Sequence, residues 1–336
     1  MDDKKLIQFR KALTTHHDSL MELLAMDSEE AKLLLGGQGT QEVLQVVSKL
    51  KNVIENIDIG EFGKCRYCDE EVELDRLEID CTTSVCLDHY SPSQLRALEH
   101  DLELAAKVQK QLLPCCVPSL KNIEIAFRSV PFHVVGGDYY DFFNHRKGSQ
   151  GFVIADVMGK GLSASMLMSN LQASLRILGP EGDDLPTITS RLNKLFCYNI
   201  RLIRFVSLFL ATFNPNTQIV EYCNAGHHPP MLWKSNGGSI QELRPTGPAI
   251  GIMEKPHFGA QNIKLVSGDI LVMYTDGLIE TMNANHEEFG ERRLARFIEE
   301  NHTGSAEYLV ENLLKSARNF SGKFQDDVTI VIVKAI

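Results

Sequence analysis

The sequence predicts an α+β protein in which a layered C-terminal domain follows a smaller helical and cysteine-containing N-terminal region. Three observations support this prediction. Helical apolar repeats fill residues 1–57, four cysteines gather within residues 58–90, and short apolar runs separated by Gly, Pro and Asn follow Pro114. With 336 residues, 43% of them hydrophobic, the chain has room for two domains and a sizeable core.

The composition excludes several classes of protein. The chain carries 44 acidic and 34 basic side chains, a formal net charge of -10, so we expect no direct contact with nucleic acid. No apolar stretch approaches the roughly 20 residues of a membrane helix. The N-terminal Met-Asp-Asp-Lys-Lys lacks the apolar core of a signal sequence, and the eight cysteines then favour reduced thiols or metal sites over disulfides. We therefore expect a cytoplasmic protein that contacts no membrane.

Residues 1–57 are expected to form a helical hairpin. Apolar residues recur at three- and four-residue steps over 6–24 and again over 44–57. Between these two stripes the glycine-rich run 36–39 must interrupt the helix, and Thr40 could cap the second helix.

The cysteine-rich segment that follows is predicted to bind one structural zinc ion. Cys65 and Cys68 form a Cys-x2-Cys pair, and seventeen residues separate it from the Cys-x2-His pair of Cys86 and His89. Zinc takes four nitrogen or sulfur ligands in a tetrahedron, and paired spacings of this kind bring four ligands together. Cys81 lies in the same span and could replace His89, so the fourth ligand stays open.

The run from Ile59 to Cys68, followed by Arg76-Leu77-Glu78, resembles the zinc finger of the DksA/TraR proteins. Members of that family carry a helical hairpin before the finger and act on RNA polymerase through its secondary channel. The resemblance covers about 90 residues and implies a contact with RNA polymerase. Family members usually have cysteine at the last ligand position, where this chain has His89, and the hairpin here is short. The finger could therefore keep the fold without acting on the polymerase.

Residues 91–113 are predicted to form one amphipathic linker helix. Pro92 suits its first turn, and Pro114 ends it. Its apolar seam alternates steps of three and four residues over Leu95, Leu98, Leu102, Ala105, Gln109 and Leu112. The seam could join two copies of the chain in a homodimer or pack on a neighbouring domain. Because a continuous helix is stiff, we expect the N-terminal region to regulate the C-terminal domain through it.

Residues 114–336 alternate clusters of strands with pairs of helices, the pattern of an α+β layered domain. Strands are expected at the apolar runs 123–130, 151–157, 205–213, 219–223, 270–274 and 328–333. Helices are expected over 162–178, 187–203, 291–301 and 306–319.

Aspartate-bearing motifs dominate this C-terminal domain. Asp138 lies in Gly-Gly-Asp-Tyr-Tyr-Asp, Asp156 in Ala-Asp-Val-Met-Gly-Lys-Gly, and Asp276 in Thr-Asp-Gly-Leu. Asp326 and Asp327 open the last apolar run. Carboxylates that converge from strand ends form an oxygen site suited to Mg²⁺ or Mn²⁺. Because such carboxylates repel one another without a cation, a bound metal is the simplest explanation.

Together these motifs resemble the PPM metal-dependent protein phosphatases of the RsbU/SpoIIE branch, over residues 105–336. The resemblance extends to the runs 108–114, 224–230 and 247–251. It implies a β-sandwich flanked by paired helices and a site with two divalent ions, usually Mn²⁺ or Mg²⁺. It also implies hydrolysis of phosphoserine or phosphothreonine in a protein by water that the two metals activate. Substrates in this branch are often anti-sigma-factor antagonists, which implies a regulatory phosphoprotein as the substrate.

The resemblance also implies roles for individual residues. Asp156 would bridge the two ions, and the Val157 carbonyl would bind one of them. Asp276 and Asp326 would hold the other ion, while Asp138 would orient metal-bound water.

Four further residues of this domain lie in these motifs and runs, and each is assigned separately. Asp327 stands where relatives carry Asp or Asn, so we place it in the Mn/Mg site behind the ligands that touch the ions. His227 and His228 would point to opposite faces of a strand, so at most one could serve as a general acid, and a structural histidine is the alternative. Lys160 could meet phosphate or lie solvated in its turn.

The sequence argues against several other enzymatic functions. A Cys-x5-Arg motif is absent, which argues against a cysteine phosphatase. Gly-Gly-Asp also resembles the signature of cyclic dinucleotide synthases, but here Tyr-Tyr follows it. Gly161 after Lys160 excludes a phosphate-binding P-loop. The alternative that stays open is a transcription-associated protein that docks on RNA polymerase through its finger and uses the phosphatase domain as a scaffold.

Overall fold

The computed structural model of the chain describes residues 3–25, 40–199 and 205–336. The chain divides into two compact units, one of Met1–His100 with Arg201–Ile203 and the other of Asp101–Ile200 with Arg204–Ile336. None of the helices in the described part of the chain is both long enough and apolar enough to cross a membrane.

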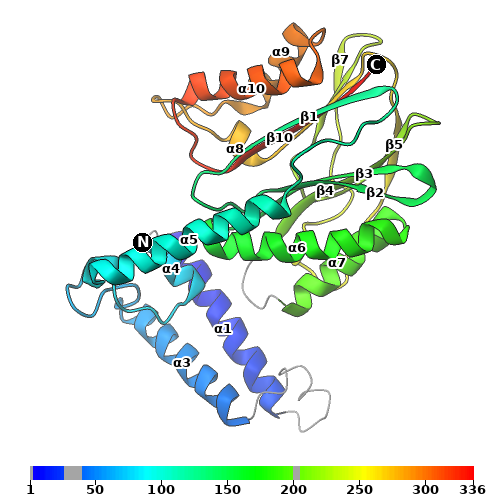
Figure 1. Cartoon of the computed structure of the whole chain (residues 1–336). Coiled ribbons are helices and arrows are strands. Elements are labelled where there is room, and N and C mark those ends of the chain that lie inside the picture. Colours follow the sequence, from blue (N-terminus) through cyan, green and yellow to red (C-terminus); the bar gives the residue numbers. More distant parts are fainter. Residues whose placement is uncertain (1–2, 26–39, 200–204) are drawn as a thin grey trace. The chain divides into compact units, whose positions relative to one another are not determined.

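The first unit begins with two helices, α1 (Asp3–Ala25) and α3 (Thr40–Asp58), which pack against each other as the apolar repeats predict (Figure 1). Their shared core consists of Leu13, Leu20, Val43, Val47, Leu50, Val53 and Ile57. Arg10 joins the two helices through an ion pair with Asp58, in which Nε lies 2.6 Å from Oδ1. The glycine-rich run 36–39 lies outside the described residues.

The cysteine-rich segment has little regular structure. It contains the short helix α4 (Leu74–Ile79) and the single 3-10 turn η1 (Leu87–His89). Its core is four residues, Cys65, Val72, Leu77 and Cys86. A core this small favours a bound metal as a staple for the segment.

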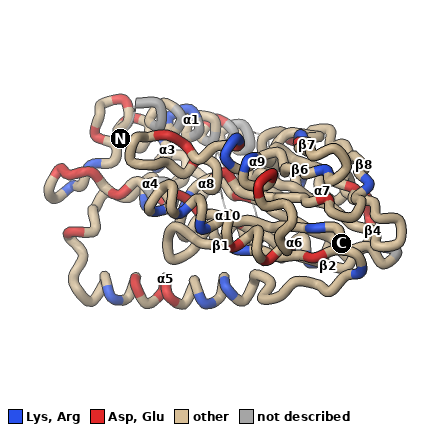
Figure 2. Tube along the Cα trace, turned by 90° about the horizontal axis from the view of Figure 1, so that it is seen from above, with Lys and Arg blue, Asp and Glu red and all other residues tan. Residues whose placement is uncertain are grey.

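The predicted linker helix is α5 (Pro92–Leu112), and the division between the two units falls within it. Charged residues of both signs occur along it (Figure 2). Its apolar seam is only partly covered, since the Leu98 side chain keeps 43% exposure, whereas Gln109 is buried.

The second unit is a sandwich of two antiparallel sheets, each with five strands (Figure 1). One sheet has the order β1 (Ile123–Val130), β10 (Val328–Ala335), β9 (Ile270–Tyr274), β6 (Met231–Lys234) and β7 (Ser239–Glu242). The other has the order β2 (Tyr139–Asn144), β3 (Gln150–Val157), β4 (Val206–Asn214), β5 (Ile219–Ala225) and β8 (Gln261–Lys264). Large apolar side chains such as Phe152, Phe209 and Val331 fill the space between the sheets.

A pair of helices covers the outer face of each sheet (Figure 1). Helices α6 (Gly161–Glu181) and α7 (Leu185–Asn199) share a core with β3, β4 and β5. Helices α9 (Gly290–Asn301) and α10 (Ala306–Ser321) share a core with β1, β9 and β10. These two layers of helices around two layers of strands confirm the predicted α+β class.

All six predicted strands are present, with ends that shift by two residues at most. The helix expected over 187–203 is described as far as Asn199, and residues 200–203 lie outside the described part. Four strands were not predicted: β2, β6, β7 and β8. Strands β7 and β8 are edge strands with the polar sequences Ser-Ile-Gln-Glu and Gln-Asn-Ile-Lys. An apolar-run criterion misses them because an edge strand buries little of its side-chain surface.

Candidate functional site

The predicted aspartates gather at one end of the sandwich, and both sheets contribute. Asp156 is the last residue but one of β3, and Asp138 directly precedes β2. From the other sheet, Asp276 follows β9 and begins the short helix α8 (Asp276–Ile279). Asp326 and Asp327 lie just before β10. Strand ends therefore hold all five carboxylates close to the ordered core of the domain.

These carboxylates form one electrostatic cluster. Burial raises the pKa of Asp138 well above its usual value, and the charges of Asp156 and Asp327 raise it further. Burial likewise raises the pKa of Asp156, and the charges of Asp276 and Asp326 add to the shift. The pKa of Asp276 is raised by burial and then by Asp326. Each carboxylate disfavours ionisation of the next, and Lys160 pairs with Asp326 alone. The oxygen donors of the cluster therefore fit a hard divalent cation.

A tight group of potential metal ligands includes two residues that the sequence did not assign to the metal. His228, Asp276 and Glu280 place one ligand atom each within 4.8 Å of one another. Among the described residues, no three of the predicted aspartates lie this close to one another. Glu280 follows Asp276 by four residues, one turn of helix, and this i,i+4 spacing is the sequence signal that would have found it.

The two adjacent histidines occupy the loop after β5, and not a strand as the sequence suggested. His227 is buried, and its Nε2 donates to the Tyr274 carbonyl at 3.1 Å while its Nδ1 accepts from the Ser207 hydroxyl at 2.8 Å. Burial lowers the pKa of His227 to about 3, so this ring stays neutral. His227 therefore fits the role of a structural histidine and not that of a general acid. Only His228 belongs to the acidic cluster.

Asp327 fixes the loop that carries Asp138. Its Oδ1 accepts the Phe132 N–H and its Oδ2 accepts the Gly137 N–H, both at 2.7 Å. A Cβ on Gly136 would lie 2.6 Å from Asp327 Oδ2, so only glycine fits this close approach. Asp327 therefore acts on the backbone of residues 132–137.

Further contacts position the remaining predicted groups. The Thr275 hydroxyl donates to Asp138 Oδ2 at 2.8 Å, and it accepts the Thr329 N–H at 2.9 Å. Thr275 therefore ties the carboxylate of Asp138 to the other sheet. The Val157 carbonyl lies close to Gly137. A Cβ at Gly137 would be only 2.9 Å from the Val157 carbonyl oxygen.

Gln109 connects the linker helix α5 to the same turn. Its Nε2 donates to the Gly136 carbonyl at 2.6 Å, and its Oε1 accepts the Gly136 N–H at 3.1 Å. The sequence placed Gln109 only in the apolar seam of the helix. A buried glutamine in such a seam is a signal of a specific polar partner, because buried amides are hydrogen-bonded.

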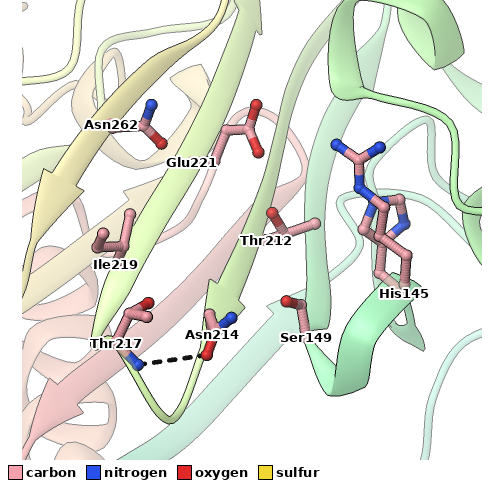
Figure 3. Close-up of a pocket in the computed structure, with 9 residues that line it drawn as sticks. His145, Ser149, Thr212, Asn214, Thr217, Ile219, Glu221 and Asn262 are labelled. Carbon is pink, nitrogen blue, oxygen red and sulfur yellow. Dashed lines mark hydrogen bonds between the residues drawn. The ribbon is translucent and has the colours of Figure 1, made fainter.

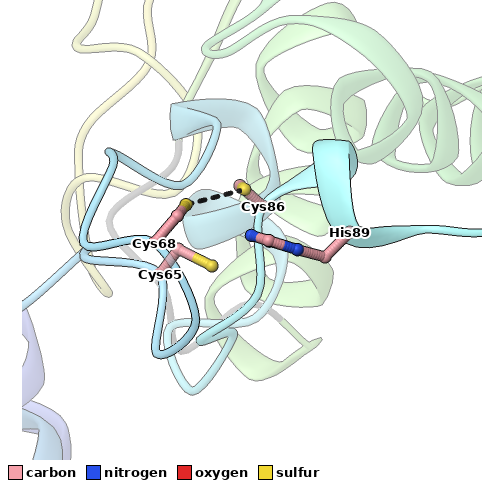
Figure 4. A group of neighbouring side chains, drawn as sticks. All are labelled: Cys65, Cys68, Cys86 and His89. Atoms are coloured by element: carbon pink, nitrogen blue, oxygen red, sulfur yellow. Dashed lines mark hydrogen bonds between the residues drawn. The ribbon is translucent and has the colours of Figure 1, made fainter.

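The cysteine-rich segment brings four potential zinc ligands together, with ligand atoms within 4.8 Å of one another: Cys65, Cys68, Cys86 and His89 (Figure 4). Cys81 is not in this group and packs against the core of α1 and α3. Burial would raise the pKa of the Cys65 thiol, but backbone N–H groups led by that of Cys86 lower it to about 6. A thiol that ionises this readily suits a metal ligand, which must be a thiolate.

Side chains of α4 and its flank hold the second ligand pair in place. Arg76 Nη1 donates to the Val85 carbonyl at 2.6 Å, and its Nη2 donates to the Tyr90 hydroxyl at 2.6 Å. The Leu87 N–H donates to Glu73 Oε1 at 2.7 Å. These bonds fix the backbone on both sides of Cys86 and the side chain of Tyr90, next to His89.

A separate polar cavity of about 190 Å³ lies at the other end of β3, β4 and β5 (Figure 3). Its lining includes His145 and Ser149 from the β2–β3 connection, together with Thr212, Glu221 and Asn262 from three adjacent strands. None of the predicted site residues lines this cavity.

Similarity to curated proteins covers both parts of the chain. Phosphoserine phosphatase RsbU of Bacillus subtilis (strain 168) is 29% identical over 239 residues, which are 70% of this chain and 70% of that protein. Phosphoserine phosphatase RsbP of the same organism is 26% identical over 188 residues, 54% of this chain and 46% of that protein. The RNA polymerase-binding transcription factor DksA of Haemophilus influenzae is 24% identical over 116 residues, 29% of this chain and 79% of that protein.

Solved structures share the fold. The SiaA-PP2C domain of Pseudomonas aeruginosa superposes with a TM-score of 0.62 at 19% identity, over 73% of this chain and 100% of that chain. A crystal structure of RsbX in complex with magnesium gives a TM-score of 0.51 at 17% identity, over 66% of this chain and 99% of that chain. The sequence profile described as Stage II sporulation protein E (SpoIIE) matches residues 146–336, more than half of the chain. The chain therefore belongs to the SpoIIE family.

Proposed function

We propose that this chain hydrolyses phosphoserine or phosphothreonine in a regulatory phosphoprotein, with two Mn²⁺ or Mg²⁺ ions held by the aspartate cluster. The observation that carries the proposal is the convergence of Asp138, Asp156 and Asp276 from both sheets, with pKa values raised by burial and mutual repulsion. Membership of the SpoIIE family and similarity to phosphoserine phosphatase RsbU support it. The magnesium in RsbX supports the choice of cation.

Asp156, Asp276 and Asp326 are the proposed ligands, together with the Val157 carbonyl. When bound, the ions supply a water-derived nucleophile at neutral pH and offset negative charge on the phosphoryl oxygens. The protein's own part is to hold the oxygen donors in place. Thr275 holds the Asp138 carboxylate, Asp327 and Gln109 hold the turn before it, and His227 holds the Tyr274 carbonyl two residues before Asp276.

Phosphate release from p-nitrophenyl phosphate and from a phosphoserine peptide, with Mn²⁺ and then with EDTA, tests this proposal. We expect Asp156→Asn and Asp276→Asn to lose at least about 100-fold in ion-dependent kcat, the scale of losing one stabilising group. Asp183→Asn is the matched control, because Asp183 is half-exposed and pairs with Arg191. Near-normal turnover of both site variants at saturating Mn²⁺ contradicts the two-metal assignment.

For the N-terminal region we propose one structural zinc ion held by Cys65, Cys68, Cys86 and His89. Two cysteines are buried in the small core of this segment, and the four ligand atoms lie within 4.8 Å of one another. Because zinc binding requires reduced thiols, the predicted cytoplasmic location is part of this proposal. Elemental analysis of the purified full-length chain is expected to find one zinc per chain, and a zinc-free preparation that stays folded contradicts it.

A second candidate function is binding to RNA polymerase through the finger. The similarity to DksA favours it, since that match spans 79% of the DksA length. One experiment distinguishes polymerase binding from phosphatase activity. Pull-down of purified RNA polymerase by wild-type protein and by Asp156→Asn reports binding, while phosphate release by the same two proteins reports catalysis. Polymerase capture without any ion-dependent phosphatase activity supports the scaffold alternative.

We further propose that the chain has four parts, with limits at residues 1–57, 58–90, 91–113 and 114–336. In this proposal residues 91–113 form the interface of a homodimer. The exposed Leu98 on α5 leaves apolar surface for a second copy. In this arrangement the N-terminal region regulates the phosphatase through α5.

A further inference from the structure

Two lysines from separate turns each lie against the same aromatic ring, beside the aspartate cluster. Lys160 lies in the turn between β3 and α6, and Lys323 lies in the turn between α10 and β10. Their ammonium nitrogens lie 5.3 Å and 5.7 Å from the centre of the Phe132 ring. A cation at this distance from an aromatic face is attracted by the ring quadrupole, so each of the two charges is attracted to Phe132.

This group of Phe132, Lys160 and Lys323, the lysine lip, is joined directly to the aspartates. The Phe132 N–H donates to Asp327 Oδ1 at 2.7 Å. The Lys160 ammonium lies 2.6 Å from Asp326 Oδ2 and donates to the Gln325 carbonyl at 3.0 Å. The lip is therefore the edge of the site at which a substrate arrives from solvent, since both Lys160 and Asp326 keep about two-fifths of their side-chain surface exposed.

Pairing with the aspartates does not account for both lysines. Lys160 already has Asp326 as its counter-charge. Lys323 is exposed and forms no ion pair with any of the described residues, yet its ammonium lies over the same ring. The two ammonium groups beside one ring raise the local positive charge, which a bound anion would offset. Of the two ammonium groups in the lip, only that of Lys160 therefore has a carboxylate as an ion-pair partner among the described residues.

We propose that the lysine lip is the subsite that receives the phosphoryl group of the substrate. This inference rests on the proposed phosphatase function and adds residues to it. A phosphate monoester carries close to two negative charges at neutral pH, and a protein of net charge -10 with clustered carboxylates repels it. Lysine binds phosphate as a point charge on a flexible stem, so the two ammonium groups attract the dianion without fixing the protein part of the substrate.

Steady-state kinetics at saturating Mn²⁺ test the subsite with Lys323→Gln, Lys160→Gln and the double variant. Lys323→Gln is the cleaner of the single variants, because Lys323 does not touch Asp326. We expect the double variant to raise KM about tenfold, or about 1.4 kcal/mol, for both a phosphoserine peptide and p-nitrophenyl phosphate, with kcat changed less than about twofold. Lys323→Arg keeps the charge and the contact with the ring and is expected to restore the wild-type KM.

Lys315→Gln is the matched control, since Lys315 is an exposed lysine of α10 with no partner among the described residues. An unchanged KM for both substrates in the double variant overturns the subsite. A rise for the peptide alone, with p-nitrophenyl phosphate unaffected, also overturns it, because the lysines then bind acidic groups of the substrate protein.

Calorimetric titration of inorganic phosphate into the Mn²⁺-loaded protein separates this inference from the proposed function. If the wild type shows no ion-dependent hydrolysis, the phosphatase proposal fails, and the titration still reports on the lip. We expect phosphate to bind the wild type and the Lys315→Gln control equally, and the double lysine variant about tenfold more weakly. Equal affinity in all three proteins contradicts the subsite.

Discussion

The side-chain amide of Gln109 pairs with the backbone of Gly136 through two hydrogen bonds, one in each direction, at 2.6 and 3.1 Å. Gly136 is two residues before Asp138, and the next peptide N–H, that of Gly137, donates to Asp327. The turn before Asp138 is therefore held from one side by the linker helix and from the other by the segment that opens β10. A shift of α5 along its axis would act directly on this turn.

Gln109→Ala should weaken the ion site. The change leaves the buried N–H and C=O of Gly136 without these partners, at a cost of about 1–3 kcal/mol, and frees the turn to move. We expect the half-saturating Mn²⁺ concentration for turnover to rise about tenfold. Gln111→Ala is the control on the same helix, since Gln111 is exposed. Equal Mn²⁺ dependence of both variants and the wild type would show that α5 does not position this turn.

The approximate location of the site could be predicted from the sequence, because several of its residues come directly at the ends of apolar runs. Asp156 and Asp276 come at the ends of apolar runs that are buried strands, so their approximate positions depend on local pattern alone. The contacts of Gln109 and Asp327 with the turn at Gly136 and Gly137 could not be predicted from the sequence. Each joins segments far apart in the chain, 27 residues for Gln109 and 190 for Asp327. Such pairings depend on the tertiary fold, which no local periodicity encodes.

A local contact explains why the two histidines were misplaced. Adjacent His227 and His228 follow an apolar run, and a strand was inferred to continue through them. The chain instead leaves β5 at Ala225, and Asn224 accepts the His227 N–H through its side chain at 2.8 Å. A side-chain-to-backbone bond of this kind competes with continued strand pairing.

Gly277→Ala should destabilise the domain. A Cβ at this position would lie 2.0 Å from the Asp327 carbonyl oxygen, a backbone atom that cannot move without disturbing the start of β10. Overpacking of this kind costs about 1–3 kcal/mol. We expect a lower midpoint of thermal unfolding and weaker Mn²⁺ activation. In Gly259→Ala the nearest atom, the Thr246 carbonyl oxygen, lies 3.6 Å away, so this control should unfold like the wild type.

His227 should make stability fall as the pH is lowered. Its pKa is lowered by burial to about 3 in the fold, whereas an unfolded histidine titrates near 6.5. Between these values the unfolded chain binds a proton that the fold excludes. The stability from His227 is therefore complete above about pH 6.5 and decreases by about 1.4 kcal/mol per pH unit below it. Above pH 6.5 His227 does not change the free energy of unfolding with pH.

Urea unfolding at pH 7.5 and at pH 5.5 measures this effect as a difference between proteins. The loss of unfolding free energy from pH 7.5 to 5.5 should be about 1.4 kcal/mol smaller in His227→Gln than in the wild type. Other groups titrate equally in both proteins and cancel in this comparison. The exposed His100 supplies the control His100→Gln, which should keep the wild-type pH dependence. An identical pH dependence in His227→Gln would show that the ring takes up its proton in the fold at the same pH as in the unfolded chain, which contradicts the lowered pKa.

Substitutions should distinguish the four proposed zinc ligands from Cys81 by their effect on the zinc content. Cys68→Ser removes one ligand of the group within 4.8 Å, and we expect it to lose the metal, because three ligands hold zinc far more weakly than four. His89→Cys supplies a thiolate at the same position and should retain one zinc per chain. Cys81→Ser should also retain it, since Cys81 packs against the α1 and α3 core. Zinc loss in Cys81→Ser together with retention in His89→Ala would reverse the assignment.

The seam of α5 should set both oligomeric state and turnover. Leu98 is exposed by 43%, and Leu102 lies four residues further along the same face. In the proposed homodimer these side chains meet those of a second copy, and Gln109, at the same end of the helix as the catalytic domain, transmits the position of α5 to the Gly-Gly turn. Leu98→Glu with Leu102→Glu places like charges in this interface, and we expect a monomer by light scattering with turnover changed at least about threefold. Leu104→Glu adds a charge at an exposed leucine outside the seam and should leave both measurements at wild-type values. If the double variant keeps the oligomeric state and the rate of the wild type, α5 serves as a spacer between the two parts of the chain.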